Sequence, residues 1–339
     1  MRTLKSKLIN LIKDQGPLGL DQFMDLVLYD PECGYYHQRE PAMLGRDFIT
    51  APEMGEIFAD ALSVWLKPAI ELNHIEQVIE LGPGAGALAQ QLGSHWQDLI
   101  RTYYCVEKSI GLQAYQKDKL SGPIHYEWGL ADLDPQPSSL VIANEFLDAL
   151  PAKRIYKRED DCLESCIDFQ DHFKWHTIPT DIQLEHFGSA EGVCDVIDYN
   201  PLFEMLKPLA HSLVVLIDYG YHASEYIAHP QLRDSLRGFY RNQVIHEPWQ
   251  HLGQMDLTVD INFSRLAFQA EAEGWQVISY FRQSELIQLL MKQGLERTYD
   301  PYQIKQLMYP TQMGERVRVM VLSRQSSLVH LNQIGLERL

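Results

Sequence analysis

The stretch VIELGPGAGALA, residues 78–89, runs from apolar residues into alternating glycines and then into a helix-forming segment. This pattern predicts a buried strand that ends at Leu81, a tight turn made by the glycines, and the start of a helix. Glycine tolerates a positive φ and lets the backbone approach a ligand closely. The turn is therefore a candidate site for a nucleotide-like cofactor.

The glycines fit two cofactor patterns. Gly82, Gly84 and Ala87 satisfy G-x-G-x-x-G/A, which is typical of dinucleotide sites. The pattern E-x-G-x-G-x-G, typical of S-adenosylmethionine (SAM) sites, is satisfied by Glu80, Gly82, Gly84 and Gly86. A carboxylate at Glu80 would repel a pyrophosphate but attract the cationic amino-acid end of SAM. The turn therefore favours SAM as cofactor over NAD.

Composition limits the classes of partner. The chain has 339 residues, of which 45% are hydrophobic and 22% charged, as in ordinary folded proteins. Its formal net charge of −17 disfavours nucleic acid, because an acidic surface repels phosphates. The richest basic cluster, within residues 153–158, is followed directly by three acidic residues. A basic peptide or a small molecule suits this surface better.

The five cysteines are odd in number and lack zinc-ribbon spacing, so we expect reduced thiols and no metal site. No apolar run approaches the length of a membrane span, and the basic N-terminus continues into a helical pattern without a cleavable spacer. These features predict a cytoplasmic protein if the source is bacterial. A mitochondrial location is expected only if the source is eukaryotic.

The periodicity divides the chain into three parts. Residues 1–75 form a predicted N-terminal helical extension, with helices at 4–13, 20–28 and 52–72 and a Pro-, Gly- and Tyr-rich loop at 31–53 whose length indicates a function. Residues 76–152 and 206–339 form the predicted core, with strands at 77–81, 101–106, 125–128, 139–143, 212–217 and 275–281. Residues 153–205 read as an inserted β meander, and 222–260 as a loop region on the substrate side.

Strands that alternate with helices predict a doubly wound, mainly parallel sheet. The last strand, 316–322, alternates arginine with valine, which predicts a half-exposed antiparallel edge strand. An antiparallel last strand is a feature of class I methyltransferases and is not needed by dehydrogenases. The fold class is therefore α/β: a Rossmann-like class I SAM-methyltransferase sheet with a helical extension and an inserted β/helical lid.

Polar residues follow the predicted strands at the edge where ligands bind in open α/β sheets. Glu107 ends the second strand and is placed to accept both ribose hydroxyls, while Asp132 follows the third strand as an adenine contact or a helix cap. Asn144 and Glu145 end the fourth strand, and Asp148 follows; Asn144 and Asp148 are alternatively helix caps. The sequence NEFLD replaces the [N/D]-P-P-[Y/F/W] motif of enzymes that methylate DNA amines.

Further acidic residues lie later in the chain. Asp218 ends the fifth strand, and Asp256 and Asp260 precede the helix predicted from residue 261. Asp260 is alternatively the cap of that helix. Arg237 and Arg241 are close enough in sequence to neutralise these acids in salt bridges, instead of facing a substrate.

The ordered series GRDFITAPEMGEIFADAL, IELGPGAG, VEKS, ANEFLDALP, LIDYG, RGFYRNQ and DLTVDINF resembles the MidA-like SAM-dependent methyltransferase family, and the likeness spans roughly residues 20–322. That family has a mitochondrial member that is a respiratory complex I assembly factor with protein-arginine methyltransferase activity. The resemblance implies the fold, SAM and a protein substrate, for which a respiratory-complex subunit is one candidate. Ala85 departs from the larger polar or basic residue expected there.

Methylation of arginine needs a group that binds and polarises a permanently charged guanidinium. Glu145 and Asp148 are the predicted carboxylate clamp, with Asp256 as a further catalytic residue. Two alternatives stay open on the sequence. One is a SAM-binding assembly factor with little catalysis. The other is an NAD-linked oxidoreductase, which lacks an obvious catalytic histidine or Lys–Tyr pair.

Overall fold

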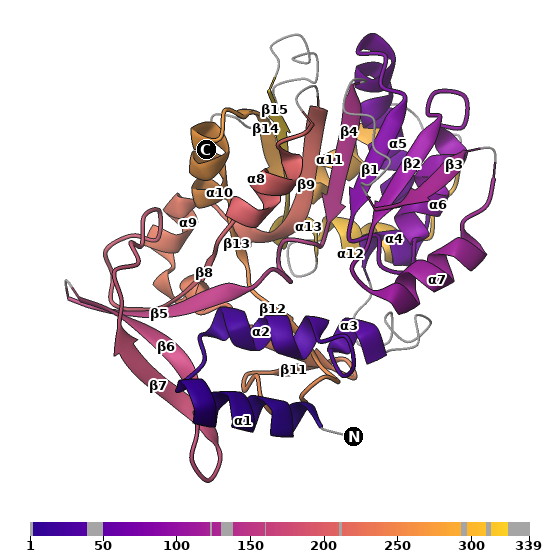
Figure 1. Cartoon of the computed structure of the whole chain (residues 1–339). Coiled ribbons are helices and arrows are strands. Elements are labelled where there is room, and N and C mark those ends of the chain that lie inside the picture. Colours follow the sequence, from indigo (N-terminus) through magenta and orange to yellow (C-terminus); the bar gives the residue numbers. More distant parts are fainter. Residues whose placement is uncertain are drawn as a thin grey trace.

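The computed structural model of the chain describes residues 3–38, 50–122, 124–129, 138–159, 161–209, 212–292, 297–309 and 313–324. A central sheet runs in the order β14-β15-β9-β4-β1-β2-β3 (Figure 1). Its strands are β1 (Gln77–Leu81), β2 (Thr102–Val106), β3 (His125–Trp128), β4 (Ser139–Asn144), β9 (Ser212–Tyr221), β14 (Gln276–Arg282) and β15 (Val317–Ser323).

Neighbouring strands from β9 to β3 are parallel, whereas β15 is antiparallel to both β9 and β14. This topology confirms the predicted doubly wound sheet with an antiparallel last strand. The short strand β13 (Ile261–Asn262) extends the sheet by pairing in parallel with the end of β9.

The expected edge position of the last strand is wrong. β15 lies between β9 and β14, and all of its residues are buried. Arg318 is only 4% exposed, and its Nη2 atom donates to Glu225 Oε1 at 2.9 Å. The buried arginine of this alternating pattern therefore forms an ion pair with a half-buried glutamate, which compensates in part for the cost of burying the guanidinium.

Helices cover both faces of the sheet, which explains the continuous apolar runs of its strands. In β9, Leu213, Val215 and Ile217 belong to one apolar core. Val214 and Leu216 belong to the other core, on the opposite face. The flanking helices are α5 (Ile57–Leu72), α6 (Ala87–His95), α7 (Ile110–Lys119), α8 (Asn200–Leu206), α10 (Phe263–Ala272), α11 (Gln283–Lys292), α12 (Pro301–Met308) and α13 (Met313–Arg316).

The N-terminal helices lie below the carboxyl edge of the sheet in Figure 1. They are α1 (Leu4–Gln15), α2 (Leu20–Tyr29) and α3 (Tyr35–Gln38), whereas α4 (Ala51–Met54) contacts α5 and α6. Leu8 and Phe23 share an apolar core with residues of the sheet, so these helices are packed onto it. The helix expected at 52–72 is divided at Gly55 into α4 and α5. None of the described helices is long and apolar enough to cross a lipid bilayer.

The segment expected as a meander forms a second, antiparallel sheet in the order β7-β6-β5-β8. Its strands are β5 (Ala152–Arg158), β6 (Asp161–Phe169), β7 (Phe173–Pro179) and β8 (Gly192–Ile197). Residues 222–260 are more regular than the expected loop. They contain α9 (Ala223–Ala228), a 3-10 helix η2 (Pro230–Arg233), β10 (Arg237–Tyr240), β11 (Gln243–Ile245) and β12 (Asp256–Thr258), with the strands in a sheet of order β11-β10-β12.

Candidate active site

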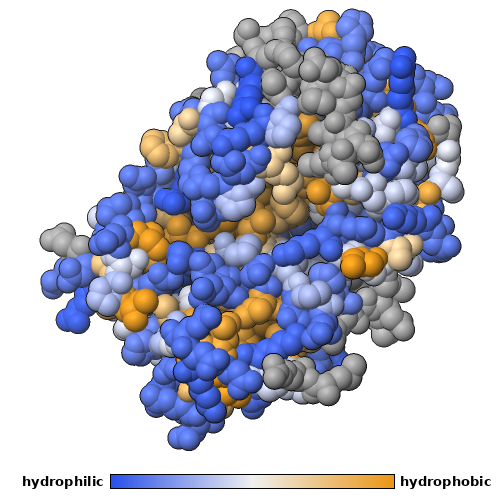
Figure 2. Space-filling view, in the orientation of Figure 1, coloured by the Kyte–Doolittle hydropathy of each residue, from blue (hydrophilic) through white to orange (hydrophobic). Residues whose placement is uncertain are grey.

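A cavity of about 330 Å³ opens at the carboxyl ends of β1, β2 and β4, where ligands bind in open α/β sheets. Figure 2 shows a hollow with apolar residues in its lining, between the part of the molecule that contains α8 and the part that contains α2. The described lining residues come from the N-terminal helices and the sheet core alike, including Tyr29, Tyr36, Thr50, Glu80, Gly84, Glu107, Asn144, Glu145, Phe146 and Met205. The cavity has the size of a small-molecule site.

The glycine turn between β1 and α6 forms one wall of the cavity. Gly82, Gly84 and Gly86 have φ values of +65°, +55° and +83°, a region that side chains with a Cβ rarely adopt. A Cβ at Gly82 would lie 2.6 Å from Phe146 Cδ2, whereas a Cβ at Gly84 would meet no heavy atom within 4 Å. The turn therefore needs glycine for its backbone, and the cavity beside Gly84 has space for a ligand.

Two carboxyl groups, one buried and one half-buried, line the cavity beside this turn. Glu80 is 3% exposed and accepts a hydrogen bond of 2.7 Å from the Tyr103 hydroxyl. Glu107 Oε1 accepts one of 2.8 Å from the Ser109 amide. Burial raises the pKa of each carboxyl group to about 7. The donors of both hydrogen bonds are uncharged, so they do not neutralise the two carboxylates. The negative charges therefore suit a ligand with a cationic end and a ribose.

Asn144 ends β4 and lines the same cavity. Its Oδ1 atom is buried and has no hydrogen-bond partner among the described residues. A buried acceptor without a partner is costly, so the atom is suited to a donor group of a bound ligand. Together with Glu80 and Glu107 it fits the ammonium and the ribose of SAM. The adenine contact predicted at Asp132 lies outside the described residues.

The raised pKa values predict that the cofactor site depends on pH. Glu80 and Glu107 are neutral below about pH 7 and ionised above it, and the ionised forms attract the ammonium and accept from the ribose. We therefore expect S-adenosylhomocysteine to bind about 10-fold more tightly at pH 8 than at pH 6. Isothermal titration calorimetry at both pH values measures this change. Equal affinities would contradict the placement of these carboxylates at the ligand.

Glu145 lies directly after β4 and lines the cavity. It has a φ of +49°, a strained value for a residue other than glycine, and its amide donates to the Ile217 carbonyl at 2.8 Å. Its Oε1 atom accepts from the Ala51 amide at 3.2 Å. Burial, and next the charge of Asp148, raise the pKa of Glu145 to about 8. The fold thus holds this carboxyl group in a fixed, largely dehydrated position.

Asp148 is 8% exposed and is not among the described residues that line the cavity. Burial raises its pKa to about 7, opposed by the charge of Arg237. Its charge in turn acts on Glu145, so the structure brings the two predicted clamp residues close to each other. Only Glu145 of this pair, however, lines the cavity.

The carboxylate of Asp218 binds backbone amides of the turn that follows β4. Its Oδ2 atom accepts from the amides of Phe146, Leu147 and Asp148 at 3.1, 2.8 and 3.3 Å. The carboxylate, which is completely buried, therefore fixes the backbone that presents Glu145 and Asp148. The sequence predicted Asp218 at the end of the fifth strand, but not this contact with the turn that follows β4.

Asp256 is 2% exposed and does not line the cavity among the described residues. Its Oδ1 atom accepts from the Tyr36 hydroxyl at 2.9 Å and from the Leu257 amide at 3.0 Å. Asp260 forms an ion pair with Arg237, as one of the two sequence interpretations proposed. The alternative, that Asp260 caps α10, is wrong, because Asn262 caps that helix.

Tyr29 and Tyr36 are lining residues that were not singled out from the sequence. Their rings stack with centroids 5.4 Å apart and an interplanar angle of 20°. For Tyr36 the signal was the length and the tyrosine content of the loop at 31–53, whereas Tyr29 precedes that loop. No local sequence pattern near Tyr29 or Tyr36 indicates that the fold brings these side chains close to β4 or β12.

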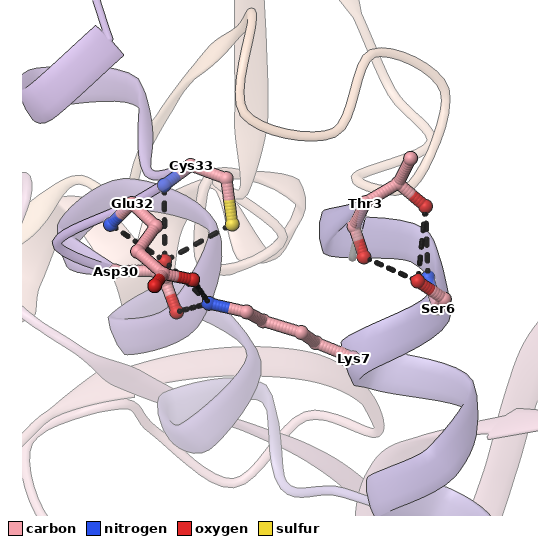
Figure 3. Close-up of polar contacts among 6 residues, drawn as sticks. All are labelled: Thr3, Ser6, Lys7, Asp30, Glu32 and Cys33. Carbon is pink, nitrogen blue, oxygen red and sulfur yellow. Dashed lines mark hydrogen bonds and ion pairs between the residues drawn. The ribbon is translucent and has the colours of Figure 1, made fainter. Parts of the chain in front are cut away.

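A polar cluster fixes the segment between these two tyrosines (Figure 3). Lys7 reaches from α1 to the carboxylates of Asp30 and Glu32, at 3.0 and 2.7 Å. Asp30 Oδ1 also accepts from the amide and the thiol of Cys33, both at 3.0 Å. Although burial opposes it, these hydrogen bonds lower the pKa of Asp30 to about 2. The first helix thereby holds the turn from α2 to α3 in place.

Comparisons with known proteins identify the family and the cofactor. A family model described as an S-adenosyl-L-methionine-dependent methyltransferase matches residues 59–281. The proteins named "Protein arginine methyltransferase NDUFAF7, mitochondrial" from Rattus norvegicus and Homo sapiens are 28% and 27% identical to the chain. Each alignment covers 92% of this chain, with 82% of the rat and 81% of the human protein.

Two crystal structures from Burkholderia thailandensis share the fold. A COG1565 superfamily member bound to S-adenosyl-homocysteine has a TM-score of 0.80 and 25% identity, covering 95% of this chain and 92% of its own. A native structure of the same superfamily has a TM-score of 0.82 and 24% identity, with coverages of 99% and 96%. The cofactor is therefore SAM, as the sequence predicted in preference to a dinucleotide. The match of the family model over most of the chain shows that this protein belongs to the family of SAM-dependent methyltransferases.

Proposed function

We propose that this methyltransferase modifies an arginine side chain of a protein. SAM, when bound, supplies a methyl group activated by its sulfonium. The glycine turn, Glu80, Glu107 and Asn144 hold the cofactor in this proposal. The relatives named as protein arginine methyltransferases support a protein acceptor, and the acidic surface supports a basic one.

The observation that carries the proposal is the position of Glu145. Its carboxyl group lies in the cavity wall, accepts from the Ala51 amide, and has a pKa of about 8 because of burial. An ionised Glu145 would pair with a guanidinium and accept the proton that the attacking nitrogen loses. Asp148, whose charge acts on Glu145, supplies further negative potential that favours a cationic acceptor.

A cytoplasmic location and an acceptor in a respiratory complex are parts of the same proposal. The mitochondrial relatives carry their location in their names. The sequence of this chain predicts a bacterial cytoplasm or, for a eukaryotic source, mitochondria. A subunit of a respiratory complex is an acceptor that is compatible with both locations.

The test is to incubate the purified protein with SAM labelled on its methyl group and an extract of its own cells. Labelled bands are then digested, and the modified residues are identified by mass spectrometry. We expect label on methylarginine of one or a few proteins. Label on another side chain would overturn the arginine assignment. Binding of SAM without any labelled protein would instead favour the assembly-factor alternative.

A further inference from the structure

Tyr36 offers a hydrogen-bond acceptor to the cavity. A tyrosine hydroxyl has one proton and two lone pairs. The Tyr36 proton is directed at Asp256 Oδ1, 2.9 Å away, while the side chain itself lines the cavity. The lone pairs of the oxygen are therefore left for another donor. Asp256 is buried and fixed by the Leu257 amide, so the direction of the hydroxyl is set by the protein.

The Tyr36 ring is held on several sides. It stacks on Tyr29, and the edge of Tyr35 packs against it at 5.0 Å and 78°. Its backbone carbonyl accepts a hydrogen bond of 2.7 Å from the Ser109 hydroxyl, and Ser109 also binds the Glu107 carboxylate. The tyrosine is thus connected directly to the part of the site proposed to bind the ribose. Such preorganised dipoles stabilise charge without reorganisation during a reaction.

We propose that Tyr36 is a catalytic residue whose oxygen accepts a hydrogen bond from the cationic nitrogen group of the methyl acceptor. In the same proposal Asp256 is a positioning residue, which acts on the reaction through Tyr36. The inference rests on the proposed function in so far as the acceptor is a protein arginine. It replaces the direct catalytic role expected for Asp256 from the sequence, because the carboxylate is not part of the described cavity wall.

Tyr36 and Glu145 have different roles in the proposed reaction. Burial, and next the charge of Asp256, raise the pKa of Tyr36 well above 10, so its hydroxyl stays neutral and takes no proton. Glu145, with a pKa of about 8, accepts the proton. During methyl transfer, a nitrogen–carbon bond forms as the sulfur–carbon bond breaks. The nitrogen loses one proton to Glu145, and a neutral thioether leaves. Tyr36 holds another N–H of the guanidinium during this step.

The test compares two tyrosines of α3. Tyr36→Phe is expected to lower kcat/KM for the labelled acceptor protein by about 10-fold, because one hydrogen bond to a charged group is lost. Affinity for S-adenosylhomocysteine is expected to stay within about 2-fold, since in this proposal the lone pairs of the hydroxyl bind the acceptor and not the cofactor. Tyr35→Phe is the matched control. It removes a hydroxyl from a fully buried neighbour that is absent from the described cavity lining.

Asp256 is tested through coupling. Asp256→Asn keeps an oxygen that can accept the Tyr36 proton and should retain most of the activity. Asp256→Leu should lower it as much as Tyr36→Phe does. In the Tyr36→Phe background, Asp256→Leu should cause little further loss of methyl transfer, because Asp256 contributes to the reaction through the Tyr36 hydroxyl, which is already absent. Circular dichroism and S-adenosylhomocysteine binding identify any variant that has failed to fold. If Asp256→Leu fails to fold, the activity of Asp256→Asn is the result that tests the role of Asp256.

Full activity of Tyr36→Phe, equal losses in Tyr35→Phe and Tyr36→Phe, or additive losses with Asp256→Leu would each overturn the inference. A second measurement separates it from the proposed function. N-acetyl-arginine amide is titrated into the protein saturated with S-adenosylhomocysteine, and Tyr36→Phe should weaken its binding by about 5-fold. If no protein in the extract is labelled but this difference persists, the cation site stands and the proposed function fails. Absence of probe binding to the wild type would overturn the inference.

Discussion

Gly84→Ala is expected to lower the affinity for S-adenosylhomocysteine by at least about 10-fold, which corresponds to about 1.4 kcal/mol of binding free energy. Gly84 lines the cavity, and a Cβ built on it meets no protein atom within 4 Å. The added methyl group therefore occupies space that the ligand needs, and does not clash with the protein. Isothermal titration calorimetry gives the affinity, and thermal unfolding gives the accompanying loss of stability.

Gly274→Ala is the matched control for this substitution. Gly274 follows α10, has a φ of +81°, and also has no atom within 4 Å of a built Cβ. Both variants carry the same kind of backbone strain, about 1–2 kcal/mol, and should lose similar stability. Only Gly84→Ala should lose affinity, because Gly274 is not among the described lining residues. Equal affinities in the two variants would contradict the assignment of the glycine turn as the cofactor wall.

Glu145→Gln is expected to lower methyl transfer by at least about 10-fold while leaving affinity for S-adenosylhomocysteine within about 2-fold of the wild type. Glutamine keeps the size of the side chain and an oxygen for the Ala51 amide. It removes the charge that pairs with a guanidinium and the site that accepts a proton. Single-turnover transfer of labelled methyl to the acceptor protein, with the cofactor saturating, measures the chemical step.

The same substitution should change the pH profile. The pKa of Glu145 is raised to about 8 by burial, so the wild-type rate should rise as pH increases through about 8 and the carboxyl group ionises. This rise should be absent from Glu145→Gln. Glu53→Gln is the control, because Glu53 also lines the cavity but its carboxylate belongs to the capping box of α4, which glutamine preserves. Unchanged turnover in Glu145→Gln would exclude it as the proton acceptor.

The parts of the fold that follow from local pattern could be predicted from the sequence. β1 and its glycine turn are encoded in one continuous stretch, because apolar run, positive-φ residues and helix start are all local features. The strands of the sheet are recognisable for the same reason, since burial on both faces requires unbroken apolar runs such as that of β9. Local pattern was accordingly enough to propose site residues at the ends of β1 and β2, namely Glu80, Gly82, Gly84 and Glu107.

Contacts between distant segments could not be predicted in this way. The alternating arginine of β15 indicated an exposed edge, but Arg318 is buried and pairs with Glu225 of α9, which lies far from it in the sequence. Asp256 looked like a catalytic residue because it is one of several carboxylates that the sequence places in the loop region on the substrate side. Whether such a group meets a substrate or another side chain depends on which segment packs against it.

The sequence by itself determined the sheet, the glycine turn and the acidic character of the cofactor site. Only the tertiary structure decided that Asp218 holds the 146–148 backbone, that Tyr36 stands between Asp256 and the cavity, and that Glu145 lines the cavity while Asp148 does not. The physical reason is the range of the interactions. Helix, strand and turn preferences act over a few neighbouring residues, whereas a buried carboxylate takes its role from a hydrogen-bond donor that the fold brings from elsewhere in the chain.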